Sequence, residues 1–271
     1  MKPTVLDIIS ILEALAPEHT AEPWDNSGFQ LGDKNAPVHK VAVSLDPTPA
    51  VIADAVSRNA ELLVTHHPLI FPHITHIDRT APIGDAIARA LAHGLSIYCS
   101  HTPLDHARRG TNFALAEMLK LLDPMPILYR PGEKASPDTV DGIIVTGTLK
   151  RPAPLATFAE YVRDALGATR VRYVGEGMIQ VHVVSVCGGS GGDYIALAGE
   201  QGANVFVTGE IRHHQALAAL DMGMNIVEAG HHYTEWCTVP HMAHTIREEA
   251  ERNGFSIDVE IVSAPSPFVT I

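Results

Sequence analysis

The chain has 271 residues, 46% of them hydrophobic and 18% charged, a composition typical of a folded globular protein. Its formal net charge of −12 argues against binding to nucleic acid, which requires a basic surface. The sequence shows no apolar run as long as a membrane span, no signal-peptide pattern, and three cysteines too widely separated for a disulfide framework. We therefore expect a cytoplasmic protein, with a length that suits two α/β lobes better than one core.

Residues 1–123 are predicted to form the first α/β lobe. Residues 4–7 have the pattern of a capping box before an amphipathic helix. Residues 16–39, rich in Pro, Gly, Asn and Asp, are expected to form a long loop that either lines a site or folds over the core. Strands are then predicted at 41–45, 62–65 and 95–100, with helices at 49–59, 83–93 and 113–122. This alternation indicates a mostly parallel sheet with right-handed crossovers.

Residues 124–177 are predicted to be a linker and middle segment, with strands at 143–146 and 171–174 and a helix at 155–166. Residues 178–271 are predicted to form a second, similar α/β lobe, which is also expected to have a mostly parallel sheet. Its expected strands are 181–186, 205–208, 226–227 and 257–262, and a helix is predicted at 235–252. The glycine-rich run from Gly188 to Gly192 is interpreted either as a plain strand-to-helix turn or as a phosphate cradle made of backbone N–H groups.

Two stretches of the first lobe are similar to two of the second. Residues 62–67 and 205–210 are each an apolar strand that ends in threonine and a polar pair, and residues 94–101 and 223–231 each lead to a histidine. We interpret this as a degenerate internal duplication. Because ligands bind outside the carboxyl ends of parallel strands, we expect both lobes to contribute these polar residues to one cleft.

The polar residues that follow these strands are mostly imidazoles and carboxylates, in a chain with 16 histidines; they are His66, His67, His101, Asp105, His231, His232 and Glu235. Such ligands suit Zn²⁺, Mn²⁺, Fe²⁺ or Ni²⁺. More than four candidates, two of them carboxylates able to bridge, favour a two-metal site over one structural zinc.

Several of these residues also have a simpler interpretation. Asp105 alone would more often cap a helix or turn, and His232 is expected to support a ligand rather than to bind metal. His213 and His214 are expected at a solvated helix start, with a cleft-facing role as the alternative. His231 and Glu235 are four residues apart, so they share a face if their segment is helical.

Six motifs of the chain resemble those of the Nif-three-like dinuclear metal-centre family, whose members are named GTP cyclohydrolase 1 type 2 homologues. They are WDNSG (24–28), VTHHP (64–68), SHTPLD (100–105), GTN (110–112), TGE (208–210) and GHHYTE (230–235). The resemblance implies two divalent metal ions held by His66, His67, Asp105, His231 and Glu235. It also implies an α/β/α protomer with two similar lobes and the metal site between them, in a ring-like homohexamer.

The resemblance further implies a metal-dependent hydrolase in which a metal-bridging hydroxide opens the purine imidazole ring of GTP and releases formate. His101 is then a candidate proton shuttle, and Glu210 a candidate contact to the purine edge or to a ligating histidine. Two alternatives remain open: a metal-binding, metal-delivery or scaffold protein without turnover, and a dinuclear phosphoesterase acting on nucleotides. The sequence shows no obvious arginine cluster for a triphosphate.

Overall fold

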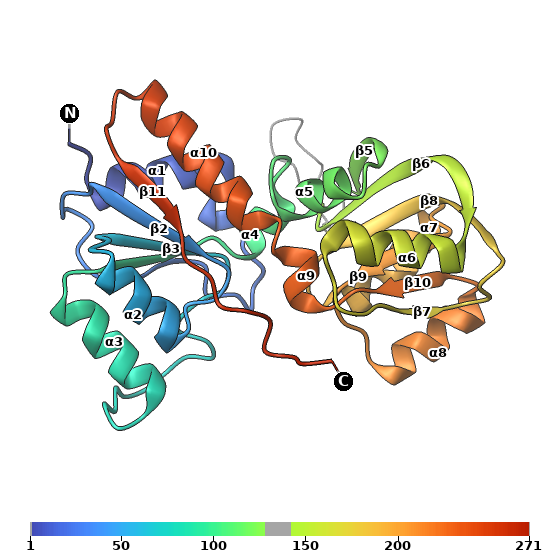
Figure 1. Cartoon of the computed structure of the whole chain (residues 1–271), viewed down its shortest axis with the longest axis horizontal. Coiled ribbons are helices and arrows are strands. Elements are labelled where there is room, and N and C mark those ends of the chain that lie inside the picture. Colours follow the sequence, from blue (N-terminus) through green and yellow to red (C-terminus); the bar gives the residue numbers. More distant parts are fainter. Residues whose placement is uncertain (1, 128–141, 271) are drawn as a thin grey trace. The chain divides into compact units, whose positions relative to one another are not determined.

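The computed structural model describes residues 2–127 and 142–270, which form two compact units (Figure 1). Unit 1 comprises Met1–Leu104 and Thr238–Pro265, and unit 2 comprises Asp105–Cys237 and Ser266–Ile271. These units do not coincide with the predicted ranges 1–123, 124–177 and 178–271. The middle segment is part of unit 2, and Thr238–Pro265 of the predicted second lobe belongs to unit 1.

Unit 1 has a five-stranded sheet with the strand order β1-β4-β3-β2-β11. Strands β2 (Lys40–Ser44), β3 (Leu62–Thr65), β4 (Ser96–Cys99) and β11 (Asp258–Ile261) are parallel, and β1 (Gly28–Leu31) pairs antiparallel with β4. All residues of β3 and β4 are buried, as the short apolar runs in the sequence indicate. The predicted mostly parallel sheet is therefore present in unit 1.

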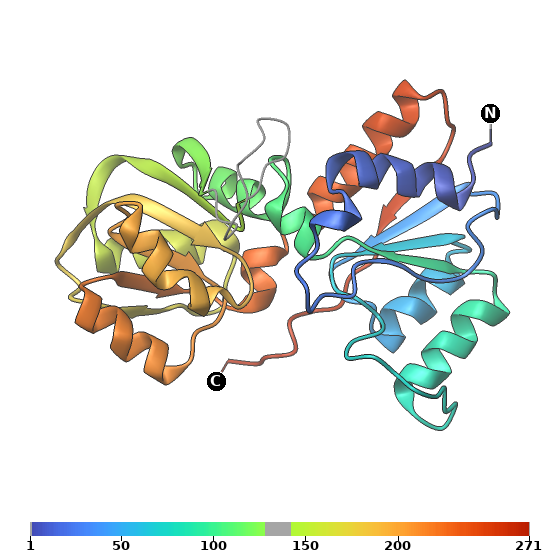
Figure 2. The same ribbon diagram turned by 180° about the vertical axis from the view of Figure 1, so that it is seen from behind.

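Helices cover both faces of this sheet. Helices α2 (Pro49–Ser57) and α3 (Pro82–Ala92) lie on one face, and α1 (Val5–Leu15) and α10 (Thr238–Arg252) lie on the other (Figures 1 and 2). Helix α1 begins with the predicted capping box: the Asp7 carboxylate accepts from the Thr4 N–H at 2.7 Å, and Thr4 Oγ1 accepts from the Asp7 N–H at 3.3 Å.

Unit 2 has a six-stranded sheet with the strand order β5-β6-β8-β9-β10-β7. Only β8 (Gln180–Cys187), β9 (Val205–Thr208) and β10 (Asn225–Glu228) are parallel to one another. Strands β5 (Leu122–Ile127), β6 (Ile144–Pro154) and β7 (Arg172–Val174) all pair antiparallel. The expectation of a mostly parallel second sheet is therefore wrong, because the middle segment adds antiparallel strands on both sides of the parallel core.

The helices of unit 2 also lie on both faces of its sheet. Residues of α5 (Thr111–Met118) and α6 (Leu155–Leu166) pack in one hydrophobic cluster, and residues of α7 (Ile195–Glu200) and α8 (His213–Met222) pack in another. The short helix α9 (His231–Glu235) follows β10. Each unit is thus a three-layer α/β/α arrangement. Among the residues that the structure describes, no helix is both long and apolar enough to cross a membrane.

The same succession of elements occurs in both units: β2-α2-β3-α3-β4 in unit 1 and β8-α7-β9-α8-β10 in unit 2. In each unit an antiparallel edge strand, β1 or β7, pairs with the last strand of this series. The similar sequence stretches therefore lie at equivalent places, in β3 and β9 and in β4 and β10.

Some elements differ from the prediction. The expected loop 16–39 contains β1 and a 3-10 helix at Glu18–Thr20, and the prolines at 124 and 126 lie within β5. Proline is tolerated there because β5 is an edge strand. The helix predicted at 235–252 is α10, which begins at Thr238, and Glu235 is the last residue of the separate short helix α9. The helix predicted to reach residue 122 ends at Met118. Pro131, Gly132 and Pro137 of the expected linker lie outside the described residues.

The side chain of Asn112 joins three backbone segments of unit 2. It is 1% exposed, in the first turn of α5. Its amide nitrogen donates to the Asp105 carbonyl at 3.2 Å and to the Ile143 carbonyl at 2.8 Å, and its Oδ1 accepts from the Gly188 N–H at 2.8 Å. It thereby fixes the segment that carries Asp105 against the loop that follows β8.

We expect Asn112→Ala to lower the free energy of unfolding by about 2–4 kcal/mol, because it leaves buried backbone groups without partners. Urea denaturation of the metal-free protein measures this difference. Asn253→Ala, which removes an exposed bond to the Glu249 carbonyl, is the control and should cost less than about 0.5 kcal/mol. Equal costs for the two variants would contradict the assigned role of Asn112.

Candidate metal centre

Three histidines of unit 1 meet at the carboxyl ends of two neighbouring strands. His66 and His67 follow β3, and His101 follows β4 one residue after Ser100. The ring centroids lie 5.1 Å apart for His66 and His67, 5.2 Å for His66 and His101, and 5.5 Å for His67 and His101. One nitrogen from each ring lies within 4.8 Å of the other two, a spacing that suits a shared metal ion.

The Nδ1 atom of each of these rings forms a hydrogen bond with an oxygen atom. His66 Nδ1 lies 3.0 Å from the Ser100 carbonyl oxygen, His67 Nδ1 lies 2.8 Å from Asp46 Oδ1, and His101 Nδ1 lies 2.7 Å from Asp25 Oδ1. Because these oxygens accept, each Nδ1 donates a proton, and in the neutral ring Nε2 then keeps its lone pair. This is the form of histidine that binds metals, so the three residues fit a divalent ion.

Asp25 and Asp46 are site residues that the sequence interpretation did not identify. Asp46 follows β2 and could have been found by the rule that identified His66 and His101, because it too is a polar residue just beyond a buried strand. Asp25 lies in the WDNSG motif, and its side chain is fully buried. Its carboxylate also accepts from the backbone N–H and the hydroxyl of Thr102. Burial favours a higher pKa for Asp25, but the hydrogen bonds from His101 and Thr102 outweigh it and lower the pKa below its usual value.

In unit 2, His231 and Glu235 lie four residues apart in α9. His231 Nε2 is 3.0 Å from Glu235 Oε2, and His231 Nδ1 is 2.7 Å from Glu210 Oε1. Glu210 therefore orients a candidate metal ligand, one of the two roles suggested for it by the sequence. If Nδ1 carries the proton, Nε2 and Oε2 are both acceptors, and two acceptors this close are stabilised by sharing a cation.

The Cys187 thiol at the end of β8 is buried near the carboxylates of Asp105 and Glu235. Burial, and then the negative charges of Asp105 and Glu235, raise the pKa of Cys187 well above its usual value. The thiol stays protonated and is a poor metal ligand. The structure of unit 2 thus brings Asp105 and Glu235 near the same strand end and leaves imidazole and carboxylate as the donors.

The glycine-rich run after β8 makes room for Glu235. Gly189 has a φ of +61°, and a Cβ atom there would lie 2.2 Å from Glu235 Oε1. The N–H groups of Gly188, Gly189 and Gly191 donate to the side chains of Asn112, Thr234 and Thr208. These N–H groups are already bonded within the protein, which favours the strand-to-helix turn over the phosphate cradle.

Residues 3–267 match the protein family described as Duf34/NIF3 (NGG1p interacting factor 3). The chain belongs to this family. A GTP cyclohydrolase 1 type 2 homolog of Clostridium perfringens is 29% identical over 270 residues, which covers 97% of each chain. Another, of Clostridium acetobutylicum, is 28% identical over 255 residues and 94% of each chain. The crystal structure of a Staphylococcus aureus hypothetical protein covers 100% of both chains with a TM-score of 0.93 and 27% identity. The resemblance based on the six motifs is thereby confirmed.

Three other histidines that the sequence singled out in this NIF3-family chain, His213, His214 and His232, have different surroundings. The ring of His232 stacks on Trp236, with centroids 5.5 Å apart and planes 21° apart. His213 and His214 are exposed in the first turn of α8, in agreement with a solvated helix start. His101, by contrast, groups with His66 and His67, so its geometry suits a third ligand as well as a proton shuttle.

We expect Asp25→Asn to lower the free energy of unfolding of the metal-free protein by about 1–3 kcal/mol at pH 7, because an amide cannot accept all of these hydrogen bonds. The pKa of Asp25 is lowered in the folded state, so its carboxylate stabilises the protein fully above the unfolded pKa of about 4. This contribution is lost as the pH falls through the folded-state pKa.

Urea denaturation at a series of pH values tests this, with Asp85→Asn as the control at an exposed ion pair. The difference between wild type and Asp25→Asn should shrink in acid, whereas the control should differ from wild type by less than about 0.5 kcal/mol throughout. A difference that grows as the pH falls would mean that the pKa of Asp25 is raised.

Proposed function

We propose that this NIF3-family protein is a metal-dependent hydrolase that acts on a purine nucleotide. One observation carries the proposal: His66, His67, His101 and His231 each have Nδ1 bonded to a carboxylate or carbonyl oxygen. Four histidines held in the same tautomer all present the lone pair of Nε2, which can bind a metal ion or accept a proton. Histidines that only fill space in a core do not require the same ring nitrogen to be hydrogen-bonded in each case.

The proposed ligands are His66, His67, Asp105, His231 and Glu235, which would bind two divalent ions. Nitrogen and carboxylate donors suit Zn²⁺, Fe²⁺, Mn²⁺ or Ni²⁺, and the protonated Cys187 thiol supplies no soft donor. Bound divalent ions would supply Lewis acidity and make water a nucleophile near neutral pH. The protein's own contribution is to hold these side chains in the form that binds metal.

The reaction that we propose is opening of the imidazole ring of a guanine nucleotide. Water adds at C8, the ring opens to a formamide, and hydrolysis of the formamide releases formate. The relatives named GTP cyclohydrolase 1 type 2 homolog support this choice of substrate. His101 would move the proton in these steps through Nε2, while Asp25 keeps the proton on its Nδ1.

We expect two divalent ions per chain in fully metallated protein, formate release from GTP, and loss of that release on chelation. Elemental analysis and a formate assay measure these outcomes. Glu235→Ala should lose metal and activity, because Glu235 is buried beside His231, whereas Glu160→Ala, at an exposed position of α6, should lose neither. Full metal occupancy in Glu235→Ala would contradict its assignment as a ligand.

The same assay distinguishes the other functions. Bound metal without formate or phosphate release indicates a metal-binding, metal-delivery or scaffold protein. Release of phosphate without formate indicates a dinuclear phosphoesterase.

The variant His101→Ala separates a proton shuttle from a metal ligand. We expect two metal ions to stay bound and formate release to fall by about 10²–10⁴-fold, as for loss of a general acid or base. His93→Ala, at an exposed position after α3, is the control. Loss of metal from His101→Ala would make His101 a sixth ligand, and unchanged turnover would exclude both roles.

We also propose that the chain assembles as a homohexamer, as the family resemblance implies. Native mass spectrometry of the metallated protein measures the number of chains directly. A monomer at micromolar concentration would contradict this proposal.

A further inference from the structure

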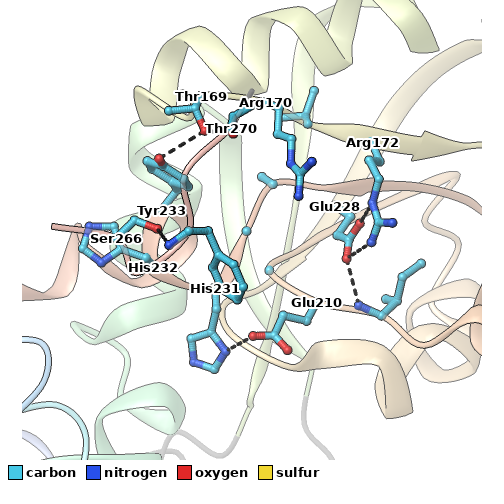
Figure 3. A pocket seen from close by; sticks show the side chains of 16 residues that line it. Thr169, Arg170, Arg172, Glu210, Glu228, His231, His232, Tyr233, Ser266 and Thr270 are labelled. Carbon is cyan, nitrogen blue, oxygen red and sulfur yellow. Dashed lines mark hydrogen bonds and ion pairs between the residues drawn. The ribbon is translucent and has the colours of Figure 1, made fainter.

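Unit 2 contains a cavity of about 320 Å³ that is open beside His231. Its wall is formed by residues 169–172, the loops after β9 and β10, the start of α9, and the C-terminal residues Ser266, Phe268 and Thr270 (Figure 3). This volume is within the range of small-molecule sites. A ligand in this cavity would be next to a proposed metal ligand.

Two arginines line the cavity, and only one of them has an acidic partner within the described part of the chain. Arg172 forms a bidentate ion pair with Glu228, and Glu210 is bonded to His231. Arg170 is exposed and has no hydrogen bond or ion pair within the described part of the chain. In Figure 3 its guanidinium points toward the middle of the side chains that line the cavity. A guanidinium in this position offers a planar set of donors that matches a phosphate group.

Aromatic and hydroxyl groups form another part of the wall. Phe268 is 71% exposed although it is a large apolar side chain. The segment that carries it is held by a hydrogen bond of 3.0 Å between the hydroxyls of Thr270 and Thr169, and Thr169 also accepts from the Tyr233 hydroxyl at 3.3 Å. An exposed ring at a cavity offers a flat apolar surface on which a nucleobase stacks.

We infer that this cavity binds a nucleoside phosphate, with Arg170 contacting the phosphate and Phe268 contacting the base. The inference deepens the proposed function and rests on it for the choice of a guanine nucleotide. The sequence showed no arginine cluster for a phosphate. In the structure, pairing of Arg172 with Glu228 leaves Arg170 as the arginine that is available to the ligand.

Equilibrium dialysis of the full-length, metal-free protein against GTP, guanosine and tripolyphosphate tests this inference. Arg170→Ala should weaken binding of GTP and of tripolyphosphate by about 10- to 100-fold and leave guanosine unaffected. Arg170→Lys should be intermediate, because an ammonium lacks the planar donor set. Arg151→Ala, at an exposed arginine of β6 outside the cavity, should bind all three compounds as wild type does.

Phe268→Ala should weaken binding of GTP and guanosine by about 5- to 50-fold and leave tripolyphosphate unaffected. Wild-type protein that fails to bind GTP, or Arg170→Ala that binds it with wild-type affinity, would overturn the inference. Tripolyphosphate that binds as tightly as GTP would overturn the contact to the base. Because binding is measured without metal, an absence of metal ions or of formate release would refute the proposed function and leave this result standing.

Discussion

The candidate site depends on the hydrogen bonds that hold the Nδ1 atoms of its histidines. A neutral imidazole has two nitrogens that exchange roles when the proton moves, and only the nitrogen without the proton binds metal. In this protein a carbonyl oxygen or a carboxylate fixes that choice at His66, His67, His101 and His231. The acceptors come from loops that follow or precede strands, so the sheets determine the ligand form of the rings as well as their positions.

The carboxylates of unit 2 add a second constraint, which is electrostatic. Burial, and then the negative charges of Asp105 and Glu235, raise the pKa of the Cys187 thiol, and Glu235 Oε2 also lies 3.0 Å from His231 Nε2. Negative charge that is concentrated at a buried strand end favours the binding of cations. The positive φ of Gly189 is part of the same arrangement, because a side chain there would occupy the space of the Glu235 carboxylate.

The sequence predicted the elements that have strong apolar patterns, and the residues that follow them. Strands β3 and β9, helix α6 and the capping box of α1 agree with the residues predicted for them. A strand buried on both faces leaves a continuous apolar run in the sequence, and a helix buried along one stripe leaves a periodic one. Strands β1 and β5 were missed because both are edge strands, most of their residues are not buried, and they contain glycine or proline. Asp25 was missed for a different reason: its bond to His101 joins residues 76 positions apart, and no local pattern records such a pairing.

The C-terminal course of the chain has a consequence for the order of folding during synthesis. Unit 2 is built almost entirely from the continuous stretch Asp105–Cys237, whereas unit 1 needs α10 and β11 from near the end of the chain. Strand β2 stays an open edge until β11 pairs with it, and an open edge is prone to pair with other chains. On the ribosome the second unit therefore completes its sheet before the first, the reverse of the usual order from the N-terminus. Until β11 emerges, the edge of β2 is open to pairing with other chains.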